Sequence, residues 1–98
     1  MDAQQKANLL NNMTDNLPTL RKKLGVSQEE LSAILGINRS TLAAIENHKR
    51  PMMWNMFLAL LLIFTKNKET DKLLNVLGIY TDELNEFINY KKDNKAGI

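Results

Sequence analysis

Many of the side chains that could bind a charged ligand lie in one stretch of the chain, from Arg21 to Arg50. This stretch holds six basic and three acidic residues, whereas the rest of the 98-residue chain has no net positive charge. A guanidinium such as that of Arg39 can donate two hydrogen bonds to O6 and N7 of a guanine. The local excess of positive charge therefore supports a polyanionic partner.

The chain offers little for catalysis or for metal binding. His48 is its single histidine, and there is no cysteine, so the usual zinc ligand sets and thiol nucleophiles are missing. Ser27, Ser32 and Ser40 lack the glycine-flanked elbow of a nucleophilic serine. We therefore expect no enzyme activity, no metal and no other cofactor.

Length and hydropathy indicate one small domain over residues 1–98, because ~100–150 residues is the usual size of a domain. Met56–Phe64 is a run of nine apolar residues, shorter than the ~20 that a membrane-spanning helix needs. Met1–Met13 is polar and lacks the apolar core of a signal peptide. We therefore expect a cytoplasmic protein without a membrane role, in which the apolar run is a buried helix.

The sequence predicts an all-α fold, because no alternation of apolar and polar residues lasts long enough for a strand. Ser27 and Glu30 have the spacing of a capping box, Gly25 and Gly36 are placed to end helices, and Asn38 is placed to begin one. Helices are expected over residues 2–12, 15–24, 28–35, 39–47, 52–65, 68–77 and 82–92.

Two of these helices, 28–35 and 39–47, are separated only by Gly36, Ile37 and Asn38. A short turn that opens on glycine is the geometry of a helix-turn-helix. The apolar residues expected to face each other are Leu31, Ile34 and Leu35 on the first helix and Leu42 and Ile45 on the second. An ordinary corner of a helical bundle places leucines in the same way, so the spacing alone leaves both interpretations open.

The sequence from Ser27 to Pro51 is SQEELSAILGINRSTLAAIENHKRP, and it favours the helix-turn-helix interpretation. It resembles the Xre/Cro-type helix-turn-helix of phage repressors and bacterial regulators. The resemblance extends over about residues 14–64, and His48 stands where the family usually has glycine. It implies a lambda repressor-like DNA-binding domain of four to five helices over residues 14–64, followed by extra C-terminal helices in residues 65–98. The positions that carry it are Gln28, Leu31, Leu35, Gly36, Ile37, Ile45, Glu46 and Asn47.

The resemblance also implies a role for each helix of the motif. The first helix braces on the DNA backbone, and the second lies in the major groove. It further implies an ion pair between Arg21 and Glu46 beneath the second helix. Lys49 and Arg50 are expected to contact phosphate. The remaining residues assigned to DNA are Gln28, Asn38, Arg39, Ser40, Thr41, Ala43, Ala44 and Asn47.

The function expected from these features is sequence-specific binding of double-stranded operator DNA by a transcriptional regulator, a repressor that reads the major groove with residues 39–47. A homodimer is expected, because helix 52–65 is apolar nearly all round and operators of this kind usually have two half-sites. The alternative is an antitoxin or protein-interaction module that keeps the fold, with a protein partner on the C-terminal helices. The polar, basic-flanked face of helix 39–47 favours DNA.

Overall fold

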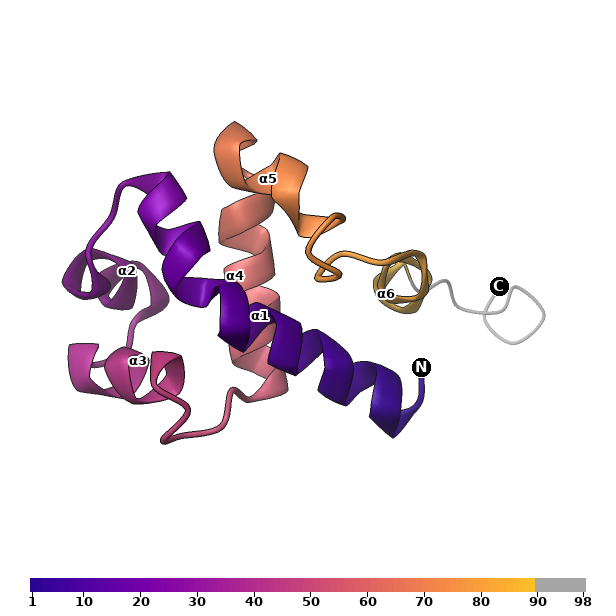
Figure 1. The fold of residues 1–98 in the computed structure, drawn as a ribbon, viewed down its shortest axis with the longest axis horizontal. Coiled ribbons are helices and arrows are strands. Elements are labelled where there is room, and N and C mark those ends of the chain that lie inside the picture. Colours follow the sequence, from indigo (N-terminus) through magenta and orange to yellow (C-terminus); the bar gives the residue numbers. More distant parts are fainter. Residues whose placement is uncertain (90–98) are drawn as a thin grey trace, which may run out of the picture.

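The computed structural model describes residues 1–89, which form six helices and, within that part of the chain, no strand. The all-α class expected from the sequence is confirmed. The helices are arranged around α1 and α4, with α2 and α3 at one end of the molecule and α6 at the other (Figure 1). Their bounds are α1 (Ala3–Leu24), α2 (Gln28–Leu35), α3 (Arg39–Glu46), α4 (Trp54–Thr65), α5 (Lys68–Leu74) and α6 (Asp82–Ile88).

The N-terminal part of the chain is one continuous helix, α1, so the prediction of two helices over 2–12 and 15–24 was wrong. Met13 and Thr14, where the break was expected, are buried. Because these two residues are buried, the helix continues through them, although the local sequence shows no strong preference for helix at this point. The apolar residues of α1 recur every three or four positions and form a single buried stripe, which consists of Leu9, Met13, Leu17 and Leu20.

Pro18 lies inside α1 and does not end it. Proline lacks the N–H that would bond to the carbonyl of Thr14, and its ring crowds that carbonyl, so it bends a helix that packing holds together. The ribbon of α1 changes direction part-way along its length (Figure 1). The bend lets the second half of α1 approach α3 while the first half runs towards α6.

The apolar helix α4 crosses α1 and packs against both α1 and α5. Its residues Phe57, Leu60, Leu61 and Phe64 are buried, so the chain itself covers most of the apolar run Met56–Phe64. Leu62 is the main exception, with 60% of its surface exposed. Over residues 1–89, no helix is both long enough and apolar enough to cross a membrane.

The C-terminal helices share the core of the helix-turn-helix region: Leu74, Ile79 and Leu84 belong to the same buried cluster as Leu20 and Leu31. α5 ends earlier than expected, at Leu74 rather than at residue 77. After α5 the chain turns, and Gly78 in this turn has a left-handed backbone (φ 69°). The Gly78 carbonyl accepts a 3.0 Å hydrogen bond from Nδ2 of Asn12 on α1. This tertiary contact fixes the turn.

The other helices end close to the expected positions. α3 ends at Glu46 and α4 begins at Trp54, one residue before and two residues after the predicted bounds. α6 begins at Asp82, where the side chain of Thr81 accepts a 3.1 Å bond from Leu84 N–H as its cap. The last part of the helix predicted over 82–92 lies outside the described residues.

Candidate nucleic-acid interface

The start of α2 is fixed by the capping box expected from the sequence. The Ser27 hydroxyl accepts from Glu30 N–H at 3.0 Å, and the Glu30 carboxylate accepts from Ser27 N–H at 2.9 Å. Hydrogen bonds from the Ser27 backbone and hydroxyl hold the pKa of Glu30 below its ordinary value, since they stabilise the charged form. The box fixes where α2 begins and therefore where Gln28 is placed.

The turn between α2 and α3 has the geometry that the sequence predicts. Gly36 is left-handed (φ 73°), and Ile37 N–H donates to the Ser32 carbonyl at 3.0 Å, which closes the helix in a Schellman motif. Asn38 stands at the N-cap of α3 with extended backbone, but its side chain makes no capping hydrogen bond. That side chain is exposed and remains available to a ligand.

The packing of α2 on α3 differs from the prediction at one residue. Leu31, Leu42 and Ile45 are buried as expected, whereas Ile34 is 60% exposed, so its assignment to the inner face was wrong. The buried side of α2 is centred between Leu31 and Ser32. Ile34 lies three residues after Leu31, on the far side of Leu31 from Ser32, and therefore faces outward.

The outer face of α3 presents the residues that the sequence assigns to DNA. Arg39 and Ser40 are exposed at the first turn of the helix, and Asn47 is exposed at its end. Between them, Thr41, Ala43 and Ala44 are half-buried. Because the two alanines end at Cβ, the backbone of α3 can come close to a surface laid against it.

Arg39 and Gln28 line one open cavity at the N-terminal ends of α2 and α3. Its volume is about 500 Å³, and its other lining residues are Arg21, Ser27 and Glu29. The cavity is polar and opens beside the first turn of α3. The two predicted contact residues thus lie together although they are separated in sequence.

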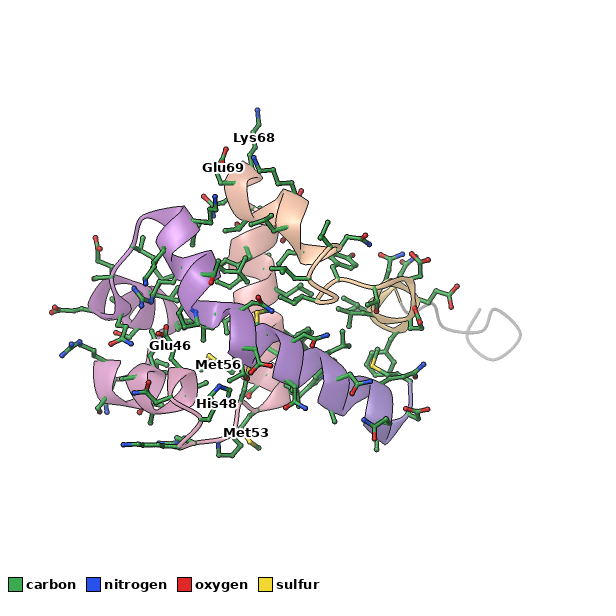
Figure 2. The ribbon with its side chains drawn as sticks, viewed as in Figure 1. Glu46, His48, Met53, Met56, Lys68 and Glu69 are labelled. Atoms are coloured by element: carbon green, nitrogen blue, oxygen red, sulfur yellow. The ribbon has the colours of Figure 1, made fainter. Side chains whose placement is uncertain are left out.

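Beneath α3, the carboxylate of Glu46 joins three helices. Arg21 Nε on α1 donates to Glu46 Oε2 at 3.0 Å, and Gln28 Nε2 on α2 donates to Glu46 Oε1 at 3.0 Å. Arg21 also donates to the Val26 carbonyl at 3.2 Å. Figure 2 shows Glu46 in the space between α2 and α3.

The bond from Gln28 to Glu46 was not foreseen from the sequence. The resemblance assigns Gln28 to phosphate, and the residue is half-buried, with one of its two side-chain N–H groups committed to the carboxylate. The other N–H and the backbone at the start of α2 are the groups left for a phosphate. The sequence carried no signal for this bond, because helix faces predict neighbours but not the rotamer of a glutamine.

α3 also ends in a Schellman motif, in which His48 occupies the left-handed position. His48 N–H donates to the Ile45 carbonyl at 3.1 Å, and Lys49 N–H donates to the Ala44 carbonyl at 2.8 Å. His48 has φ 61°, a value that favours glycine. Its Nε2 lies 3.5 Å from Asp15 Oδ1 of α1, and Figure 2 shows the side chain turned towards that helix.

This closure places Lys49 and Arg50 directly after α3, where both are exposed. They line a cavity of about 360 Å³ between the loop and α1, together with His48 and Asn11. Basic side chains thus stand at the end of α3, and Arg39 stands at its start. Within residues 1–89, no group of three potential metal ligands occurs.

Comparison with known proteins assigns the central part of the chain. Residues 19–52 match the family model described as Helix-turn-helix. This segment is a helix-turn-helix. The match runs from the second half of α1 through α2 and α3 to Met52, so it includes every residue assigned to DNA, and it supports a DNA-binding regulator. No curated protein and no solved structure matches the chain.

Proposed function

We propose that the protein is a transcriptional regulator of the Xre/Cro type that binds a specific double-stranded DNA operator and acts as a repressor. The observation that carries the proposal is the exposed, polar first turn of α3 within the segment that matches the helix-turn-helix family. In this motif the second helix enters the major groove with its N-terminal residues against the base edges. The proposal implies the cytoplasmic location that we expect from the sequence.

Arg39 and the small residues of α3 supply the readout. Arg39 is the long multi-donor side chain of the first turn, and a guanidinium that bonds O6 and N7 of guanine discriminates by ~1–3 kcal/mol. Ala43 and Ala44 contribute by allowing close approach, with a thymine methyl as their apolar partner. Asn38, Ser40 and Thr41 complete the surface that faces the groove.

Phosphate contacts on both sides of α3 supply the anchoring. Gln28 lies at the start of α2, and Lys49 and Arg50 lie in the loop after α3. Contacts of this kind fix the register and orientation of a domain on the duplex without reading its sequence. With Asn47 at the end of the helix, they form two lines of contact that flank the recognition helix.

A homodimer is part of the proposal. A dimer that places two copies of α3 one helical turn of DNA apart binds an operator of two half-sites. The apolar character of α4 now argues for it less strongly, because α1 and α5 cover most of that helix. At α4 itself, the support that remains is the exposure of Leu62 (60%) and of Met53 (64%) at the N-cap of the helix.

The proposal is tested by selection from random duplexes on the purified full-length protein. We expect a recurring sequence motif, and affinity for the selected duplex should exceed that for a scrambled duplex of the same length. A plot of log K against log salt should fall with a slope of several units, because phosphate contacts release counterions. No enrichment, together with a salt-independent signal on both duplexes, contradicts DNA binding.

A further inference from the structure

The surface of α6 leaves apolar side chains exposed at the end of the molecule that carries no part of the helix-turn-helix. Phe87 is 45% exposed and Ile88 is 42% exposed. A cavity of about 280 Å³ lies beside Phe87, lined by Glu83 and Glu86 of α6 and by Met1 and Gln5 at the start of α1. We call these residues, with Ile88, the α6 surface.

Two acidic residues, Glu83 and Glu86, line the cavity beside Phe87. Residues 73–89 contain Asp82, Glu83 and Glu86 and no lysine or arginine. The helix-turn-helix segment has the opposite character, with Arg39, Lys49 and Arg50 exposed. Within the part of the chain that the structure describes, the molecule therefore has a basic end at α2 and α3 and an acidic end at α6, and Figure 1 shows α2 and α3 at the end opposite to α6.

Phe87 is fixed on one side and open on the other. Its ring meets that of Trp54 edge to face, with centroids 6.2 Å apart, and Trp54 in turn stacks on Phe57 at 4.9 Å. The ammonium of Lys6 lies 4.9 Å from the centroid of Trp54. These contacts hold the aromatic side chain in place while nearly half of its surface faces solvent, which is the arrangement of an anchor that a partner can cover.

We propose that the α6 surface binds a basic, apolar segment of a partner protein. Leucine-sized side chains of that segment cover Phe87 and Ile88, and its lysines or arginines face Glu83 and Glu86. A second copy of this chain docked through the same surface would bring like charges together. DNA phosphates are repelled by the same carboxylates, so a partner bound here leaves the basic end free for DNA.

Trp54 supplies a direct measurement, because it is the single tryptophan of the chain and it touches Phe87. The full-length protein is titrated with a tryptophan-free amphipathic peptide of lysine and leucine and, separately, with its counterpart of glutamate and leucine. We expect a saturable change of Trp54 emission with the lysine peptide and no such change with the glutamate peptide.

Two double variants test where the peptide binds. Glu83→Lys with Glu86→Lys should weaken binding of the lysine peptide tenfold or more. The matched control, Glu69→Lys with Asp71→Lys on α5, changes the net charge equally and should leave the affinity within about twofold. Circular dichroism and thermal melting establish that each variant is folded. Phe87→Leu should weaken the peptide severalfold while it retains an apolar group on Trp54.

Three results overturn the proposal. Equal weakening in both double variants assigns the binding to overall charge. Peptide binding that appears only after Lys91, Lys92 and Lys95 are replaced by glutamine assigns the surface to the chain's own C-terminal segment. Sedimentation that shows a dimer which Glu83→Lys with Glu86→Lys dissociates assigns it to a second copy. None of these measurements involves DNA, so their outcome is independent of the function proposed above.

Discussion

Arg21 and Glu46 form a near-buried ion pair that connects the end of α1 to the last turn of α3. Arg21 Nε lies 3.0 Å from Glu46 Oε2, and the two side chains are 13% and 4% exposed. Arg21 Nη2 adds a second bond to Glu46 Oε1 at 3.3 Å, and Gln28 reaches the same oxygen at 3.0 Å. One carboxylate therefore connects α3 to both α1 and α2, in addition to the apolar packing of Leu42 and Ile45.

Replacing Glu46 with alanine should destabilise the protein by about 2–4 kcal/mol, because it leaves the Arg21 guanidinium largely buried without its counter-charge. For a domain of this size, that loss lowers the melting temperature by more than about 8 °C. Thermal and urea unfolding, followed by circular dichroism, measure the change.

The exposed pair of Lys72 and Glu69 provides the control. Its atoms lie 3.2 Å apart, but both side chains are 63% exposed, and surface pairs of this kind contribute ~0–1 kcal/mol. Glu69→Ala should therefore leave the melting temperature almost unchanged. If Glu46→Ala behaved like Glu69→Ala, the carboxylate would not hold α3 in place.

His48→Gly should stabilise the protein by about 0.5–1 kcal/mol. A left-handed residue with a side chain costs ~1–2 kcal/mol, and His48→Gly removes this cost. The greater freedom of glycine in the unfolded chain offsets part of the resulting gain in stability. The contact with Asp15 is lost, but both side chains are about 60% exposed, so that loss is small. His48→Ala keeps the strained backbone and should not stabilise; an equal gain in both variants would place the cause in the imidazole instead.

The capping box makes a small pH-dependent contribution to stability. Because the pKa of Glu30 is lowered in the folded protein, its contribution is present above the pKa of the unfolded chain and is lost as the pH falls through the lowered value. An NMR titration of the Glu30 carboxyl should show the low pKa. Ser27→Ala should raise that pKa only part of the way to the ordinary value, because alanine keeps the backbone N–H that bonds the carboxylate and removes only the hydroxyl. The same substitution should cost about 0.5–2 kcal/mol as the loss of an N-cap. A Glu30 titration that is unaffected by Ser27→Ala would contradict the contribution of the hydroxyl and assign the lowered pKa to the backbone N–H alone.

Local signals in the sequence were sufficient to place the helix bounds within the helix-turn-helix. Ser27, Glu30, Gly25 and Gly36 each act through hydrogen bonds within a few residues, so their types and spacing determine where α2 begins and where α1 and α2 end. Arg39 is exposed in the first turn of α3, on the flank of the face that carries Leu42 and Ile45.

Contacts between distant residues were not predictable in this way. The continuity of α1 across Met13 depends on its burial, and the turn that follows α5 is held by the bond from Asn12 to the Gly78 carbonyl. The outward position of Ile34 depends on the crossing of α2 and α3. Each of these depends on which surfaces meet in three dimensions, and propensity is a weak guide there.

Sedimentation velocity across micromolar concentrations should show a dimer of the full-length chain. If the exposed part of α4 contributes, Leu62→Lys should shift the protein towards monomer, because it places a charge in an apolar contact. Val76→Lys is the control, since Val76 is more exposed (81%) and lies outside α4. A monomer at every concentration refutes the dimer.

Arg39 should carry base discrimination, and Lys49 should carry anchoring. If Arg39 bonds guanine with both arms of its fork, Arg39→Ala costs ~1–3 kcal/mol on the selected duplex and relaxes the preference at one position of each half-site. Lys49→Ala should weaken every duplex alike and reduce the salt slope by about one, as expected for a single phosphate contact. Competition titrations against duplexes substituted at each position measure both effects in one assay. Should Arg39→Ala weaken all duplexes equally and leave the selected motif unchanged, Arg39 is an anchor, and specificity lies in Ser40, Thr41 and the alanines or in the shape of the DNA.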